Sequence, residues 1–337
     1  MTDYEETLQS SDFKDSKTGL VVFGILHIIF GGFCALMVPF MIFGMIVSTF
    51  LGKSAAASMR PTMMISALLL YTLLAVWFIW MGIGSIKARR WARALILVSS
   101  WLWLIGGMGG LIFMLLLMPD MYDRMGESEQ MPPELARITK YIMTGFMTVF
   151  YVIIPAVLVL FYGSKNVKAT CEFRDSRVRW TDKCPLPVLA LSLMFGFWAV
   201  SMPFTVFYGW AVPFFGFILT GLSGAGVLLL VMLLAGYVAW GTYKLSIKAW
   251  WCAVLLIIAW ALSTAITFSR VSIMDYYEKM NFPEQQLDIM KQYSISQDYM
   301  VLFFGLWAVG FLGYLLYTRR YFVRPAEQEI VSQQTLP

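Results

Sequence analysis

The sequence predicts an all-α integral membrane protein with eight transmembrane helices, and three observations carry this prediction. The 337-residue chain is 59% hydrophobic and only 13% charged, whereas soluble domains carry about 25% charged residues. Its mean hydropathy is +0.71. The apolar residues fall in runs of roughly 20, which is long enough for a helix to cross the ~30 Å hydrocarbon core. The strands of a membrane barrel would instead alternate polar and apolar residues.

Eight apolar runs define the expected spans. They cover about 20–51, 62–84, 94–117, 141–163, 185–209, 214–243, 249–269 and 299–318. The basic turn at 87–93 separates the second run from the third. Pro213 follows Gly209 and separates the fifth run from the sixth, because both residue types interrupt helices.

Lysine and arginine are divided unevenly between the two sides of the membrane that eight spans create. Seventeen of the 25 lie in the two tails and in 87–93, 164–184 and 244–248. Basic residues favour the cytoplasmic side, so we expect both termini in the cytoplasm and the protein in an inner or plasma membrane. The spans leave no acidic or basic side chain for the bilayer interior, which disfavours proton transport through intramembrane carboxylates.

The chain repeats a short pattern. Residues 32–40 read GFCALMVPF and residues 196–204 read GFWAVSMPF, 164 residues later, while SIKA occurs at 85–88 and again at 246–249. We therefore expect two tandem four-helix units that run in the same direction, as in parallel-repeat transporters. The expected boundaries are a tail at 1–19, a first unit at 20–163, a linker at 164–184, a second unit at 185–318 and a tail at 319–337.

Two outer connections carry matching four-residue segments. The first consists of Tyr122, Asp123, Arg124 and Met125, and the second of Tyr277, Glu278, Lys279 and Met280. Charged loops with aromatic side chains on a helical scaffold often contact partners, so these eight residues form the predicted outer contact surface. In the alternative interpretation each neighbouring acid and base pair with one another, which contributes only ~0–1 kcal/mol on an exposed surface.

Pro39 and Pro203 occupy equivalent positions in the repeated pattern, toward the outer ends of the first and fifth spans. Each proline removes a backbone hydrogen bond, so we expect a kink in each helix. Two matched kinks would either frame a path for a substrate or splay the helices around the outer connections.

His27 is the only histidine, and it lies inside the first span. An ionisable side chain within a membrane marks a candidate functional site. The repeat places Leu191 at the equivalent position, so no symmetric site can use a histidine. We expect a neutral imidazole that hydrogen-bonds to a neighbouring helix. One histidine cannot form a bis-histidine haem site or a multi-histidine metal centre, so we predict no cofactor and leave only bound lipid open.

Two further patterns have a structural and a functional interpretation. Cys171 and Cys184 flank the linker, and zinc shared across a dimer is the functional alternative to simple burial. Gly106 and Gly110 form a G-x-x-x-G pair in the third span. This spacing favours a close helix crossing over an unwound segment around a ligand.

The favoured function is that of a structural or accessory subunit, or scaffold, of a membrane assembly. The alternative is a transporter or channel for a neutral or lipophilic small molecule. We do not expect an enzyme, because the sequence shows no constellation of acid, base, nucleophile and metal ligands. The expected partners are the lipid bilayer and other membrane subunits or a second copy of the chain, and not nucleic acid.

Overall fold

The computed structural model describes residues 14–51, 61–127, 133–280, 282, 287–288, 291 and 297–322. Within these ranges, eight helices are long and apolar enough to cross a membrane: Lys17–Val47, Met64–Ile86, Arg90–Leu115, Arg137–Gly163, Leu186–Tyr208, Gly221–Tyr243, Ile247–Phe268 and Val301–Phe322. The prediction of an eight-span helical membrane protein is therefore confirmed, and the protein resides in a lipid bilayer.

The chain divides into two compact units. The first unit holds residues 1–40 and 70–183, and the second holds 41–69 and 184–337. The helices at 17–51 and 61–86 therefore contribute residues to both units. The tandem repeat and the membrane orientation stay predictions.

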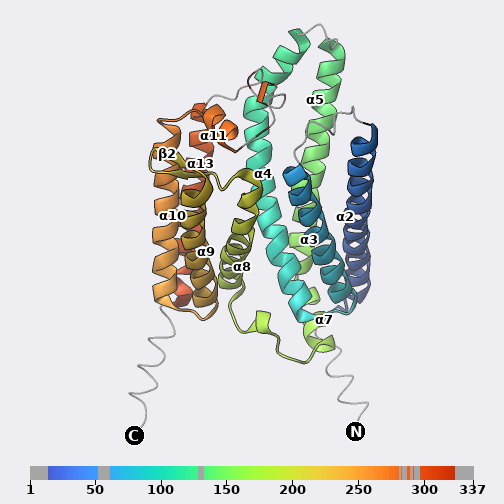
Figure 1. Cartoon of the computed structure of the whole chain (residues 1–337). Coiled ribbons are helices and arrows are strands. Elements are labelled where there is room, and N and C mark those ends of the chain that lie inside the picture. The colour runs from blue at the N-terminus through green and yellow to red at the C-terminus, as the bar shows by residue number, and fades with distance from the viewer. Residues whose placement is uncertain are drawn as a thin grey trace, which may run out of the picture. The chain divides into compact units, whose positions relative to one another are not determined.

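The first unit is built on the following elements, most of which Figure 1 labels: α2 (Lys17–Leu51), α3 (Pro61–Ile86), α4 (Arg90–Glu127), α5 (Pro133–Thr148), the π turn η2 (Val149–Ile153), α6 (Ile154–Gly163), α7 (Lys165–Arg174) and η3 (Trp180–Asp182). Its core contains Leu20, Met81, Ile96 and Tyr162, each at most 1% exposed.

Glycines bring α2 and α3 into backbone contact within the first unit. A Cβ atom added to Gly24 would lie 2.8 Å from the carbonyl oxygen of Gly82, and one added to Gly82 would lie 2.7 Å from that of Gly24. Two turns further along α2, and two turns earlier on α3, a Cβ on Gly31 would lie 3.0 Å from the Ala75 oxygen. Such small residues permit close crossings in membranes. His27 lies between Gly24 and Gly31, so the crossing turns it toward α3.

A π turn precedes α6 because of Pro155. Proline has no N–H, so the carbonyl of Tyr151 loses its helical donor, and the Ile154 N–H bonds the carbonyl of Val149 five residues back. The freed Tyr151 carbonyl packs against Gly107 of α4, where no Cβ would fit. Gly106 and Gly110 have open space at their Cβ positions among the described residues. The close packing predicted for this glycine run is thus made by Gly107, and the expected pair was the wrong choice.

The second unit comprises α8 (Leu186–Ser201), η4 (Met202–Tyr208), the strands β1 (Val212–Phe214) and β2 (Phe217–Leu219), α9 (Gly221–Tyr243), α10 (Ile247–Phe268), α11 (Ile273–Lys279) and α13 (Gln297–Thr318). Helix α9 packs between α8 and α10, and α10 also packs on α13. The Trp250 indole donates to the Leu315 carbonyl at 2.9 Å, and the Ser192 hydroxyl donates to that of Ala239 at 2.7 Å.

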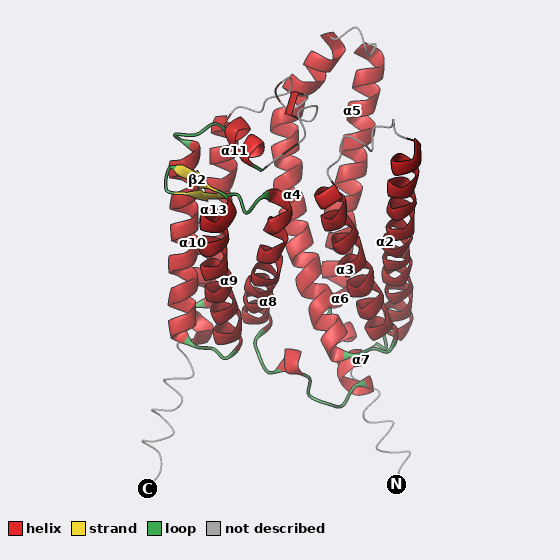
Figure 2. Ribbon diagram, in the orientation of Figure 1, coloured by secondary structure: helices red, strands yellow, loops and turns green. Residues whose placement is uncertain are grey.

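A two-stranded hairpin interrupts the helical pattern between α8 and α9 (Figure 2). The sequence predicts a helix from 214, but α9 begins at Gly221. The turn places Phe215 and Gly216 at φ of 41° and 100°, in the left-handed region that a helix excludes. Helix α10 holds this turn: the Phe215 N–H donates to the Ser263 hydroxyl and the Gly216 N–H to that of Thr267, both at 3.0 Å.

The α3–α4 and α9–α10 turns have the same backbone geometry. Ala88 has a φ of 48° in the first and Leu245 a φ of 57° in the second. The next residue in each case, Arg89 or Ser246, donates its N–H to a glycine carbonyl five residues back at 2.9 Å. This is a Schellman ending. The left-handed residues are 157 positions apart, whereas SIKA repeats at an offset of 161, so the turn geometry and the SIKA match have different offsets.

Candidate functional site

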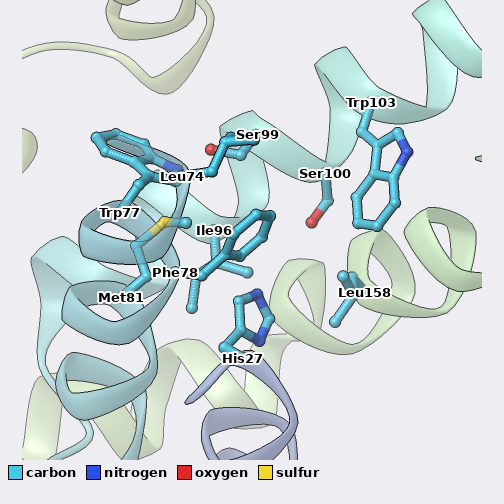
Figure 3. A pocket seen from close by; sticks show the side chains of 10 residues that line it. All are labelled: His27, Leu74, Trp77, Phe78, Met81, Ile96, Ser99, Ser100, Trp103 and Leu158. Carbon is cyan, nitrogen blue, oxygen red and sulfur yellow. The ribbon is translucent and has the colours of Figure 1, made fainter. Parts of the chain in front are cut away.

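A cavity of about 170 Å³ lies within the first unit. Helices α2, α3, α4 and α6 each contribute to its wall (Figure 3). The lining consists of His27, Leu74, Trp77, Phe78, Met81, Ile96, Ser99, Ser100, Trp103 and Leu158. His27 and Ser100 each stand ten residues beyond the first residue of their helix, so the cavity lies about 15 Å along the spans. It therefore lies well within the length of these apolar helices.

The lining is mostly apolar and carries no acidic, lysine or arginine side chain. Its polar groups are the His27 imidazole, two serine hydroxyls and two indoles. Pockets of this kind fix a ligand by apolar contact and orient it by a few polar groups.

His27 presents one ring nitrogen to the cavity. The side chain is 8% exposed, and its Nδ1 lies 2.8 Å from the Phe23 carbonyl oxygen. A carbonyl only accepts, so Nδ1 carries the proton and Nε2 of the neutral ring is an acceptor. Figure 3 shows the ring directed into the cavity, and no described residue hydrogen-bonds Nε2. The expected bond to a neighbouring helix is wrong, because the carbonyl one turn earlier on α2 takes that proton.

Ser100 provides a second polar group at the same cavity. It is 2% exposed, its hydroxyl points toward the space above His27 in Figure 3, and the described residues offer it no hydrogen-bond partner. A bound molecule with one polar group would satisfy both this hydroxyl and Nε2 of His27.

Aromatic rings connect the cavity to the π turn. The Phe30 ring lies 5.2 Å from Phe78, which lines the cavity, and 5.5 Å from Phe150 of the π turn, measured between centroids. Phe150 also meets Trp103 edge-on at 5.2 Å. Since π turns often occur at functional sites, the contact of Phe150 with the lining ring of Trp103 supports assigning the site here.

The second unit has no histidine, because His27 is the only one in the chain. Leu191, the residue that the predicted repeat matches with His27, is fully buried. The polar cavity is therefore a feature of the first unit's own sequence.

The predicted outer contact surface is described only in its second half. The side chains of Tyr122, Asp123, Arg124 and Met125 lie outside the described residues. In the second half, Tyr277 meets the Phe282 ring at 5.4 Å. Glu278 pairs with Lys291 at 3.5 Å, whereas the alternative interpretation paired it with Lys279. Lys279 and Met280 end the α11 segment. A partner for this surface stays a prediction.

The two prolines lie in different local structures. Pro39 is inside α2, which continues to Leu51. Pro203 is in the first turn of the 3-10 helix η4, just beyond the end of α8 at Ser201. The pair of matched kinks stays a prediction.

Cys171 and Cys184 are both free and buried. Burial raises the pKa of each thiol to about 11, so both stay protonated at neutral pH. The described residues contain no group of three or more histidine, cysteine or acidic side chains placed to hold a metal.

The sequence interpretation missed most of the cavity wall. The Ser99–Ser100 pair was the available signal, since adjacent hydroxyls inside a span usually bond another helix or a ligand. Trp77 and Trp103 could not be recognised as lining residues from the sequence, because the chain has 13 tryptophans and nothing in the sequence distinguishes these two. No family model, curated protein or solved structure matches this protein.

Proposed function

We propose that the protein binds a small, neutral, largely apolar molecule inside the membrane and acts as a carrier or channel for it. The cavity between α2, α3, α4 and α6 is the observation that supports this function. Its volume of about 170 Å³ is close to that of an engineered apolar cavity of about 150 Å³ that binds benzene. The occupant is thus a molecule of about one aromatic ring with a single hydrogen-bonding group.

The charge of the lining favours a neutral occupant. An ion buried at this depth needs a paired charge, and the wall offers none. The two unpartnered groups, Nε2 of His27 and the Ser100 hydroxyl, suit a neutral hydroxyl or N–H on the ligand.

Phenol is a probe of the required size and polarity, and benzoate is its charged control. Saturable phenol binding to the full chain in detergent, followed by ligand-observed NMR, is expected, with no saturable binding of benzoate. Leu158→Phe fills the cavity and should abolish phenol binding. Leu160→Phe is the matched control, because Leu160 is 75% exposed on the same helix, and it should bind phenol like the wild type.

His27→Leu tests the polar contact directly. The change introduces leucine, the residue that the predicted repeat places opposite His27 in the second unit. It removes the hydrogen bond between phenol and Nε2 of His27, so phenol affinity should fall roughly tenfold. Benzene, which makes no such bond, should bind both forms alike. Absence of saturable phenol binding, or equal binding by the Leu158→Phe variant, would contradict the proposal.

Transport is tested separately in vesicles. Phenol release from preloaded proteoliposomes should exceed release from protein-free vesicles and from Leu158→Phe vesicles, while Leu160→Phe vesicles match the wild type. Binding without this difference in release would leave a membrane-embedded binding protein rather than a transporter.

A structural or accessory role is the second proposal, and the low burial of α3 favours it. In the most apolar 18-residue stretch of this span, only 11% is buried inside the protein, which is the lowest share among the eight spans. Lipid or another membrane protein must cover the remainder. A partner that co-purifies after mild detergent extraction would support this role, and a lone monodisperse species would count against it.

A further inference from the structure

The end of the first unit that carries the turn 87–93 holds a cluster of charged side chains on α4, α7 and η3 and on the residues that flank them. We call it the arginine cluster, and it consists of Arg89, Arg90, Arg93, Lys168, Glu172, Asp175, Arg179 and Asp182. Five of these side chains are basic and three are acidic, so the cluster has a surplus of positive charge.

Asp175 is the fully satisfied centre of the cluster. Its side chain is 1% exposed and accepts from Arg179 Nε at 3.0 Å and Nη2 at 2.8 Å, a fork-on-fork arrangement. Arg89 Nη1 adds a bond at 3.3 Å, and the backbone N–H of Arg90 adds one at 3.4 Å. Asp175 therefore has no capacity left for a further arginine.

The other two acids are also engaged. Glu172 lies 3.9 Å from the Lys168 ammonium. Asp182 accepts from the backbone N–H of Arg179 at 2.9 Å and lies 3.8 Å from Arg90 Nη1. These two carboxylates and the Cys171 thiol are the titratable groups that act on Arg93.

Two arginine nitrogens of the cluster have no hydrogen-bond acceptor among the described residues. The Nε atoms of Arg90 and Arg93 are buried and have no hydrogen-bond partner, and the Arg93 guanidinium makes no ion pair or hydrogen bond with any described residue. Residues three apart on a helix share a face, so the two guanidinium groups lie on one side of α4. Both are in the first turn of a membrane-crossing helix, at the level where lipid headgroups lie.

We propose that Arg93, assisted by Arg90, binds a phosphate group. The planar guanidinium fork matches phosphate oxygens in two parallel hydrogen bonds, which would satisfy the buried Nε atoms and neutralise the surplus charge. The phosphate belongs to an anionic lipid headgroup or to a soluble phosphate compound. The site is separate from the cavity, so neither proposal depends on the other.

Native mass spectrometry of the full chain in detergent tests the site. Phosphatidylglycerol should stay bound in preference to phosphatidylcholine, whose choline offsets the phosphate charge. Arg93→Gln should weaken phosphatidylglycerol binding roughly tenfold, as expected for the loss of a charged hydrogen bond. Lys87→Gln removes the same charge from an exposed residue of the same turn and should leave binding unchanged. An equal effect of the two substitutions would overturn the site.

Two further measurements complete the test. Millimolar inorganic phosphate that displaces the lipid would assign the site to soluble phosphate, and failure to displace it would assign the site to lipid. If Arg93→Gln does not fold, Arg93→Lys keeps the charge without the fork and should bind with intermediate affinity. A wild-type melting temperature unchanged by both phosphatidylglycerol and phosphate would also overturn the proposal.

Discussion

The adjacent glycines Gly106 and Gly107 of α4 differ in whether a side chain would fit at their position. In a helix interior, glycine is about 1 kcal/mol less favourable than alanine, so a glycine there needs a reason. Gly107 has one, since the Tyr151 carbonyl occupies the place of its side chain, while Gly106 has open space there among the described residues.

Gly107→Ala and Gly106→Ala should therefore change stability in opposite directions. Gly107→Ala forces α4 away from the π turn and should lower the free energy of unfolding by roughly 1–3 kcal/mol. Gly106→Ala should leave it unchanged or raise it by up to about 1 kcal/mol. Unfolding of both variants in detergent, followed by circular dichroism, measures the difference. Equal effects would mean that the contact with Tyr151 does not limit packing.

The thiols of Cys171 and Cys184 should resist alkylation in the folded protein. A pKa of about 11 against an ordinary 9.0 lowers the thiolate fraction at pH 8 roughly a hundredfold, and burial blocks access as well. Iodoacetamide labelling of single-cysteine variants should thus be slow in mild detergent and fast after unfolding in dodecyl sulfate. Equal rates in the two states would show that these thiols are exposed.

Among the elements, the α3–α4 and α9–α10 turns are alike in backbone geometry, and this likeness pairs different residues from the SIKA sequence match. The SIKA match joins Ser85, in the last turn of α3, to Ser246, which precedes α10. The turn geometry instead joins Ala88 to Leu245. Short sequence identities between apolar segments arise by chance. In both turns, by contrast, a left-handed residue stands four positions after a glycine, and the residue that follows it donates to the carbonyl of that glycine. The sequence could not reveal this shared turn geometry, because neither left-handed residue is a glycine.

One serine of α10 bonds two backbone groups of the hairpin between α8 and α9. The Ser263 hydroxyl accepts from the Phe215 N–H at 3.0 Å and donates to the Pro213 carbonyl at 2.9 Å. Ser263→Ala leaves both groups without this partner and should cost ~1–3 kcal/mol, with faster proteolysis between 209 and 221. Ser269→Ala is the control, because its hydroxyl is exposed and bonds only its own helix. Unchanged proteolysis of Ser263→Ala would show that α10 does not hold the hairpin.

For the whole molecule, the hydrophobic composition predicts more of the fold than any sequence motif does. Eight apolar runs suffice to predict eight spans, because a membrane requires each backbone group to be satisfied within its own helix. The cavity could not be predicted, because its wall combines side chains from four helices and depends on the crossing at Gly24 and Gly82. His27 was recognised as a candidate, but its neighbours Ser100 and Leu158 follow from packing alone.

Acid should weaken the whole fold through Asp175. Its hydrogen bonds with Arg179 hold the pKa of the carboxyl below the ordinary 3.8, so the ionised form stabilises the folded state above that pH. This stabilisation should be constant from pH 7 to about 5 and should be lost as the pH falls through the lowered folded-state pKa.

Asp175→Asn should lower the free energy of unfolding at pH 7 by roughly 1–3 kcal/mol and should reduce its dependence on acid. Denaturant unfolding across this pH range measures both effects. The exposed Glu278 provides the control substitution, Glu278→Gln, which should change stability little. Equal acid dependence in wild type and Asp175→Asn would exclude Asp175 as the source.

Pro155 also determines the rotational phase of the helix that follows it. A π turn contains one residue more than an α turn, and one residue of an α-helix corresponds to a rotation of about 100°. Residues before 149 and after 153 therefore do not continue a single hydrophobic stripe, although they belong to one span. Without this extra residue, Leu158 would point away from the cavity. A backbone group that proline cannot supply thus decides which side chains of α6 line the cavity.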